Sequence, residues 1–241
     1  MTSATKVGHH LTRMSTTPDP GPIMKVIVRT TDPAKDHPLP TYLVDLSAEV
    51  MRRRLNEALT VYVDAMHYPR GTEEQRASMW LEHTRRAGWK AVAALSTTEP
   101  LAEPAPADAA EALDTGELLG IAYGYSGAPD QWWQQQVVHG LRRTGAQPDQ
   151  TDALLGDYFE LTELHIHPRA QGHGLGEALA RRLLSGRPEA RVLLSTPEIN
   201  GEANRAWRLY RRLGFGDVIR DYHFAGDPRA FAILGRSLPL D

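Results

Sequence analysis

The stretch H-P-R-A-Q-G-H-G-L-G-E-A-L-A-R-R-L-L, residues 167–184, places three glycines at alternate positions directly before an amphipathic segment. After Gly176, leucine and alanine recur at three- and four-residue steps, which predicts a helix. The segment before the glycines, residues 157–168, has the composition of a strand and ends at a proline. Glycine is costly inside regular structure and is used where the backbone must approach another group closely. The question is what this turn holds.

A turn that leads into a helix presents unpaired N–H groups at the positive end of the helix dipole. Glycines there let an anion, most simply a phosphate or diphosphate, approach the backbone. The alternative is a tight turn that packs the helix against its own strand, and glycine alone does not distinguish the two. The P-loop and the Rossmann fingerprint are both excluded, because each requires another residue where Glu177 stands.

Hydrophobic periodicity around this turn predicts strands and helices in alternation. Strands are expected at residues 24–30, 89–96, 117–126, 157–168, 190–196, 217–224 and 230–236. Helices are expected from Ser47 to residue 66, over 72–87, in an insert up to residue 143, after the glycine turn, and over 203–213. The segments before Ser47 and over 144–156 are expected to be loops.

The resulting order, β-α-α-β-β-(insert)-β-α-β-α-β-β, predicts an α/β fold with a mixed (α+β type) sheet. One domain is expected over residues 23–241, after a flexible tail at residues 1–22. Met24 is an alternative start of the chain.

Composition excludes several classes of function. The net charge of −3 gives no basic field for nucleic acid, and no run of eighteen apolar residues suggests a membrane span. The absence of cysteine excludes disulfides, thiol nucleophiles and thiolate metal sites. We therefore expect a cytoplasmic protein with neither a nucleic-acid nor a membrane partner.

The glycine turn matches a third pattern, because Gln171-x-x-Gly174-x-Gly176 has the form [RQ]-x-x-G-x-[GA]. In this the sequence resembles the GNAT superfamily of acyl-CoA N-acyltransferases, whose members bind the coenzyme A pyrophosphate with this loop. L-H-I-H-P at 164–168 is similar to the family's strand end L-x-V-x-P, and 203–215 is similar to its helix signature ending in L-Y-x-x-L-G-F. The resemblance implies an N-acetyltransferase that moves an acetyl group from acetyl-CoA to a primary amine by direct attack.

The resemblance also implies a coenzyme site. The pantetheine arm would enter a gap between strands 157–168 and 190–196 and pair with the backbone of Leu164 and Ile166. The Leu164 N–H would polarise the thioester carbonyl. Other expected coenzyme contacts are His165, Gln171, Gly172, His173, Gly174, Leu175, Gly176, Asn204 and Tyr210. Family members often have the asparagine one position earlier, at Ala203, so the Asn204 contact depends on where the helix starts.

Acyl transfer to an amine requires a base for the ammonium proton. Glu160 stands where some family members carry a glutamate base, and Glu163 and His165 are the alternatives. Strict strand alternation predicts Glu160 on the same face as Leu164 and Ile166, with Glu163 and His165 on the opposite face.

The departing thiolate also needs a proton. Tyr210 occupies the position of the family's general acid in the Leu-Tyr motif, so it is expected to supply that proton. The alternative role for Tyr210 is ordinary packing in the core.

Two other functions stay open at this point. One is a non-catalytic acyl-CoA-binding or sensor module that keeps the fold without the chemistry. The other is a zinc site built from His165, His167, Glu163 and His173, although no metal is expected because the glycine turn would then have no role. The amine acceptor and the acyl chain length are not specified by the sequence, and the family often forms homodimers.

Overall fold

The computed structural model describes residues 24–27, 40–98, 114–199 and 204–240. Its strands are β1 (Met24–Ile27), β2 (Pro40–Leu46), β3 (Lys90–Ser96), β4 (Glu117–Ser126), β5 (Tyr158–Ile166), β6 (Arg191–Pro197), β7 (Gly216–Tyr222) and β8 (Phe231–Ser237). Its helices are α1 (Ala48–Arg53), α2 (Leu55–Met66), α3 (Thr72–His83), α5 (Trp132–Arg143), α6 (Pro148–Leu155), α7 (Leu175–Leu184) and α8 (Arg205–Arg212). The expected tail at 1–22 lies outside the described residues.

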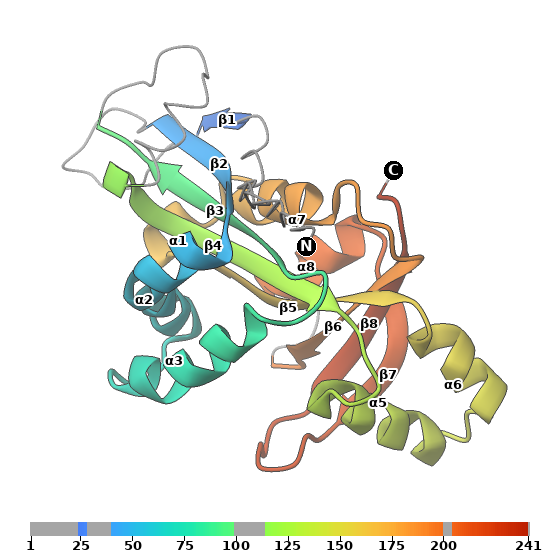
Figure 1. Cartoon of the computed structure of the whole chain (residues 1–241). Coiled ribbons are helices and arrows are strands. Elements are labelled where there is room, and N and C mark those ends of the chain that lie inside the picture. The colour runs from blue at the N-terminus through green and yellow to red at the C-terminus, as the bar shows by residue number, and fades with distance from the viewer. Residues whose placement is uncertain (1–23, 28–39, 99–113, 200–203, 241) are drawn as a thin grey trace, which may run out of the picture.

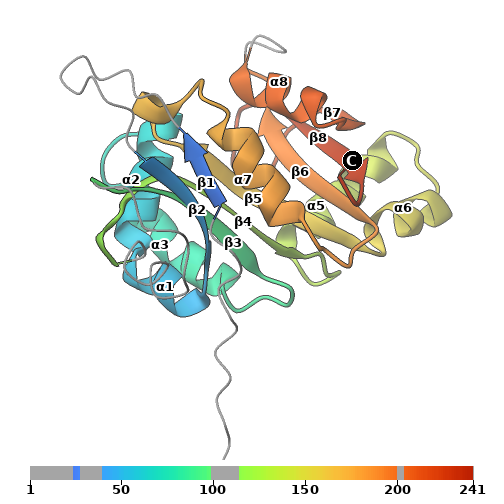
Figure 2. The same ribbon diagram turned by 90° about the horizontal axis from the view of Figure 1, so that it is seen from above.

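The strands form one sheet in the order β1-β2-β3-β4-β5-β6-β8-β7 (Figure 1). The β5–β6 pair is parallel and the other neighbouring pairs are antiparallel, so the expected mixed sheet is confirmed. Helices α1, α2 and α3 cover one face of the sheet, and α7 and α8 cover the other (Figure 2). Helices α5 and α6 lie beside β7 and β8 at one end (Figure 1).

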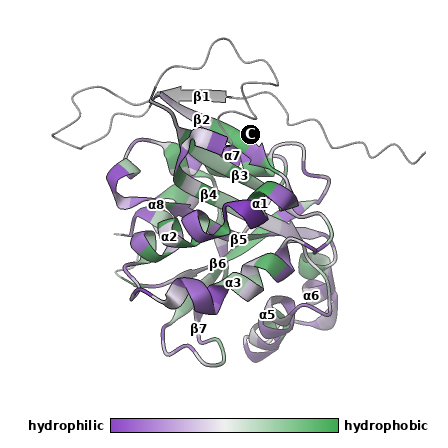
Figure 3. Ribbon diagram, turned by 60° about the vertical axis from the view of Figure 1, so that its left-hand side comes forward, coloured by the Kyte–Doolittle hydropathy of each residue, from purple (hydrophilic) through white to green (hydrophobic). Residues whose placement is uncertain are grey.

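The two faces of the sheet carry separate hydrophobic cores. One joins α7 and α8 to the sheet, with Trp207 and Leu179 fully buried. The other joins α1, α2 and α3 to the opposite face, around Trp80 and Met51. Figure 3 shows hydrophilic residues on the outer surfaces of α1 and α3, as expected for helices with one buried side. Among the described residues, no helix has the length and apolar character that crossing a membrane requires.

Three local predictions were wrong. Residues 40–46, expected to be loop, form β2, because residues 41–44 are buried between β1 and β3. The helix expected up to residue 66 is two helices that meet at Arg54, whose guanidinium turns inward to the Gly116 carbonyl (2.6 Å). The expected loop at 144–156 contains α6. This helix begins with a capping box formed by Gln147 and Gln150.

Candidate active site

Strands β5 and β6 separate part of the way along their length. They pair only at Tyr158–Glu160 with Arg191–Leu193. Beyond this point β5 stays paired with β4 up to Ile166, and β6 stays paired with β8 up to Pro197. The facing edges of residues 161–166 and 194–197 therefore have no strand partner among the described residues. Such an edge can pair with an extended ligand.

The backbone direction along β5 determines which groups face this gap. The His167 N–H donates to the Leu119 carbonyl on the β4 side (2.8 Å). Because backbone groups alternate along a strand, those of Leu164 and Ile166 point into the gap. The Ile166 carbonyl accepts a hydrogen bond from Gln171 Nε2 (3.0 Å), which ties the glycine turn to the open edge of β5.

The glycine turn stands at the open end of the same gap. Gly172 and Gly174 have φ values of +86° and +82°, which favour glycine, and a Cβ on either would meet no atom within 4 Å. Gly176 differs, because its Cβ would lie 3.2 Å from Leu209 Cδ2. Both explanations of the glycines therefore hold: two leave space in front of the turn, and the third lets α7 pack on α8.

The turn exposes the positive end of α7. The first helical hydrogen bond runs from the Ala178 N–H to the Gly174 carbonyl (3.1 Å), so the preceding amides point out of the helix. The side chain of Gln171 is held by Arg205, whose Nη1 donates to Gln171 Oε1 (2.7 Å). His173 Nε2 is buried without a hydrogen-bond partner among the described residues. Leu175 is buried, so only its backbone can face a ligand. This arrangement suits a phosphate group.

A β-bulge in β5 corrects the expected facing of the candidate bases. Tyr123 pairs with Glu163 and Gly124 pairs with Leu161, which leaves Thr162 as an extra residue. The extra residue reverses the alternation, so Glu160 lies on the same face as Glu163 and His165. The prediction that Glu160 shares a face with Leu164 and Ile166 was therefore wrong.

Glu160 is buried at the point where β5 and β6 part. Its side chain is 3% exposed, and Tyr125 donates a hydrogen bond to its Oε1 (3.2 Å). Its Oε2 is buried without a hydrogen-bond partner among the described residues. Burial raises the pKa of this carboxyl from 4.5 to about 8, although the Tyr125 hydrogen bond and the Arg86 charge oppose the shift. Glu160 can thus exchange a proton near neutral pH.

Glu163 and His165 form a second pair on this face. His165 Nε2 is hydrogen-bonded to Glu163 Oε2, and the His165 ring packs edge-on against Tyr62, with centroids 4.9 Å apart. The backbone groups of His165 alternate with those of Leu164 and Ile166, so they point to β4 and not into the gap. The sequence did not show that these two side chains would bind each other.

Tyr210 lies on α8 in the core that faces the gap. Its ring packs near Phe215, with centroids 5.6 Å apart, and the side chain is 6% exposed. Burial, and then the negative charge of Glu163, raise the pKa of Tyr210 well above its ordinary value. No described residue hydrogen-bonds its hydroxyl. Tyr210 therefore stays protonated at neutral pH, as a proton donor must.

Asn204, an expected coenzyme contact, and His167, a residue of the zinc alternative, both have local partners. Asn204 is the N-cap of α8, and its Oδ1 accepts a hydrogen bond from the Ala206 N–H (2.9 Å). His167 Nε2 lies 3.4 Å from Asp64 Oδ2 rather than beside His165. The described residues contain no group of three or more side chains that could hold a metal ion, so the residues of the zinc alternative do not gather.

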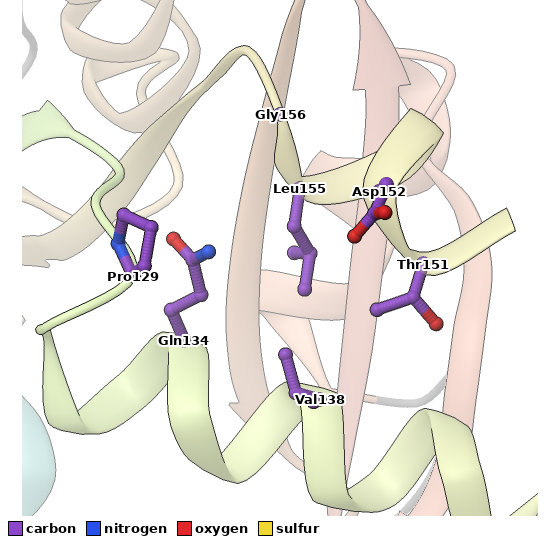
Figure 4. Close-up of a pocket in the computed structure, with 7 residues that line it drawn as sticks. All are labelled: Pro129, Gln134, Val138, Thr151, Asp152, Leu155 and Gly156. Carbon is purple, nitrogen blue, oxygen red and sulfur yellow. The ribbon is translucent and has the colours of Figure 1, made fainter. Parts of the chain in front are cut away.

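The insert after β4 carries two neighbouring tryptophans with different surroundings. Trp133 is buried and donates from Nε1 to Ser195 Oγ (3.2 Å), whereas Trp132 is 52% exposed. A pocket of about 220 Å³ lies between α5 and α6 (Figure 4). Its lining residues are Pro129, Gln134, Val138, Thr151, Asp152, Leu155 and Gly156. Gln134 links this pocket to β5, because its Oε1 accepts a hydrogen bond from the Tyr158 hydroxyl (3.0 Å).

Three residues near Glu160 were not singled out in the sequence. They are Tyr125, His83 and Arg86. Tyr125 donates the hydrogen bond to Glu160, and the His83 ring and the Arg86 guanidinium pack against the Tyr125 ring. Tyr125 stands directly opposite Glu160 in the β4–β5 register. Only the pairing of these strands reveals it, because 34 residues separate the two in sequence.

Known proteins share this fold and sequence. The model of the acetyltransferase (GNAT) family matches residues 72–215. A GCN5-like protein acetyltransferase of Mycobacterium tuberculosis is 66% identical over 203 residues, which cover 83% of this chain and 98% of that protein.

Two solved structures share the fold at 16% identity. Arabidopsis thaliana NAA60 in complex with acetyl-CoA gives a TM-score of 0.51, covering 82% of this chain and 98% of that one. A protein of Acinetobacter baylyi described as an acetyltransferase gives 0.52, covering 82% and 92%. The expected fold is thereby confirmed. The chain belongs to the GNAT family of acetyltransferases, enzymes that take acetyl-CoA as their co-substrate.

Proposed function

We propose that this enzyme transfers the acetyl group of acetyl-CoA directly to an amine of a protein acceptor. The observation that carries the proposal is the gap between β5 and β6, which begins at Glu160 and ends at the glycine turn. A protein acceptor is favoured because the relative that is 66% identical is described as a protein acetyltransferase. Lysine side chains are the most numerous primary amines that a protein presents.

The turn and the open strand edge would hold the coenzyme. The amides of residues 172–176 would donate to the pyrophosphate, where Gly172 and Gly174 leave the approach open. The backbone of Leu164 would pair with the pantetheine arm along the edge of β5. Acetyl-CoA supplies the acetyl group in activated form, as a thioester. The residues present therefore fit this co-substrate.

Glu160 is proposed as the base. A lysine ammonium has an ordinary pKa of about 10.4, so it must lose a proton before its nitrogen can attack. A base is most effective when its pKa lies near the working pH, and burial raises the pKa of Glu160 to about 8. The Glu163–His165 pair is the second candidate, because the bulge puts it on the same face.

Tyr210 is proposed as the acid that protonates the departing thiolate. Its hydroxyl has no described hydrogen-bond partner, and burial keeps it protonated. A thiol has a pKa of about 8.5, so the thiolate leaves more easily when a donor is near. Tyr210 belongs to the core under α7 and α8, whereas Glu160 contacts Tyr125 of the core under α1, α2 and α3. The two proton transfers would therefore occur on opposite faces of the sheet.

A thiol-release assay with acetyl-CoA tests the proposal. The acceptors are a lysine peptide, the same peptide with its lysine blocked and its N-terminus free, and a small diamine. We expect release with the lysine peptide, and a loss of roughly a hundredfold or more in Glu160→Gln. Glu163→Gln is the matched variant on the same strand and is expected to retain most activity.

Other outcomes would point elsewhere. If Glu160→Gln keeps the wild-type rate and Glu163→Gln loses it, the base is the Glu163–His165 pair. If every amine fails while the coenzyme still binds tightly, the chain is a non-catalytic acyl-CoA-binding module.

Location and assembly are proposed from the sequence. A cytoplasmic location is compatible with the absence of cysteine, because no disulfide of this chain requires an oxidising compartment. The family resemblance favours a homodimer, which light scattering of the purified chain tests.

A further inference from the structure

We propose that Tyr125 is a positioning residue for Glu160: its hydroxyl holds one carboxylate oxygen and so leaves the other directed to the acceptor amine. The proposal rests on the role of Glu160 given above. It concerns a residue of β4, which lies outside the glycine turn and pairs with β5 on the side away from the gap. Tyr125 would act through Glu160 and not on the reacting atoms.

The pairing of β4 with β5 puts the two side chains together. Tyr125 lies opposite Glu160 in the antiparallel register, so their side chains leave the sheet on the same face. The Tyr125 hydroxyl donates to Glu160 Oε1 over 3.2 Å, and the Tyr125 side chain is 1% exposed. Water does not compete for this hydrogen bond at such burial.

Two neighbouring side chains pack against the ring of Tyr125 and restrict its movement. The His83 ring lies 5.1 Å from it, centroid to centroid, and the Arg86 guanidinium lies 4.5 Å above it. His83 is fixed in turn, because its Nδ1 is hydrogen-bonded to the Tyr123 hydroxyl (3.1 Å). Burial lowers the pKa of His83 to about 4, so this contact is with a neutral imidazole at neutral pH. The Tyr125 hydroxyl therefore has little freedom to move.

The second oxygen of Glu160 has no such partner. Glu160 Oε2 is buried and makes no hydrogen bond with a described residue, although an unsatisfied buried polar atom is costly. A carboxylate held at Oε1 and left free at Oε2 presents one acceptor in one direction. An amine nitrogen that donates to Oε2 would satisfy it and give up its proton there.

Several groups face this carboxylate. Tyr125 from β4, Arg86 from the segment after α3 and Thr162 from the bulge stabilise its ionised form. Glu163 and burial disfavour that form. Tyr158 also lies close on β5, but its hydroxyl donates to Gln134 and not to Glu160. Tyr125 and Tyr158 are thus two buried tyrosines of which only one holds the base.

The test compares Tyr125→Phe with Tyr158→Phe. Removal of the Tyr125 hydroxyl takes away a hydrogen bond to the ionised carboxylate, so the acid limb of kcat against pH should move upward. We expect a shift of about one pH unit, which makes kcat at pH 7 roughly tenfold lower, with convergence on the wild type at high pH. KM for acetyl-CoA should not change. Tyr158→Phe should leave the limb where it is.

Two further measurements keep the outcomes distinct. Profiles with two acceptors of different amine pKa identify the limb that belongs to the enzyme, because only that limb is common to both. Thermal unfolding shows whether both variants fold like the wild type. The inference is overturned if the two tyrosine variants have the same pH profile, or if Tyr125→Phe lowers kcat equally at every pH. A wild-type rate in Glu160→Gln would instead overturn the proposed function.

Discussion

Glu160 and Tyr210 are both buried, and burial acts on their protons in the same direction. For the carboxyl, the pKa rises to about 8, into the range where a base exchanges protons. For the phenol, the pKa rises further from neutrality, so the group remains a donor. Desolvation therefore suits each residue to the step proposed for it.

Tyr210→Phe should lower turnover with little change in coenzyme affinity. The ring still fills its place beside Phe215, and only the proton donor is lost. We expect kcat to fall by roughly a hundredfold, a typical size for one acid–base group. Steady-state rates and calorimetric titration with coenzyme A measure the two quantities.

Tyr222→Phe is the matched control for that variant. Tyr222 lies on the edge strand β7, and its hydroxyl donates to the Gln136 carbonyl of α5 (2.9 Å). If Tyr210→Phe weakened coenzyme binding as much as it slowed turnover, the tyrosine would have a packing role only.

The sequence indicated these residues as candidates, but it did not give the orientation of the Glu160 side chain. The resemblance to family members with a glutamate base indicated Glu160 as a candidate, and the Leu-Tyr motif indicated Tyr210. The side of the sheet on which Glu160 lies depends on one extra residue, Thr162, and an alternation pattern does not reveal a bulge. Tyr125 is found only through strand pairing, which is a contact distant in sequence.

Among the elements, α7 is the helix on which the proposed coenzyme site depends. It begins at Leu175, directly after the glycine turn, as the leucine and alanine pattern predicts. Its other end is anchored, because Lys90 Nζ donates to the carbonyls of Arg182 (2.8 Å) and Ser185 (3.0 Å). Anchoring at the C-terminal end fixes where the N-terminal amides point.

The elements that the sequence missed are short or lack a period. β2 follows prolines, and its side chains are buried on both faces at 41–44, so it shows no alternation of apolar and polar residues. α6 is eight residues long and mostly polar, and its helical form depends on a capping box and Pro148 at its start. The long helices and the central strands were predicted because they have one buried side and a clear pattern.

At the scale of the whole molecule, the raised pKa of Glu160 links stability to pH. The folded pKa of about 8 lies above the ordinary value of 4.5, so the folded protein favours the protonated carboxyl. This contribution to the free energy of unfolding is fully present below pH 4.5 and is lost as pH rises through 8.

Glu160→Gln removes that pH dependence, because an amide does not titrate. The free energy of unfolding of the variant minus that of the wild type should therefore increase from pH 6 to pH 9, by on the order of 2 kcal/mol. Urea unfolding of both proteins at the two pH values measures the difference, in which the other titrating groups cancel. A difference that stays constant with pH would contradict the raised pKa.

Binding of the coenzyme diphosphate by the turn at residues 171–176 can be tested with two glycines that flank α7. Gly174 and Gly186 stand at opposite ends of the helix, both have positive φ, and a Cβ on either meets no atom within 4 Å. Gly174→Glu and Gly186→Glu therefore add the same charge and similar backbone strain at the two ends.

Calorimetric titration with coenzyme A gives the result. We expect wild-type affinity for Gly186→Glu and a loss of roughly a hundredfold or more for Gly174→Glu, because a carboxylate there repels the phosphates and blocks the amides. Equal affinity of Gly174→Glu and Gly186→Glu would contradict this expectation.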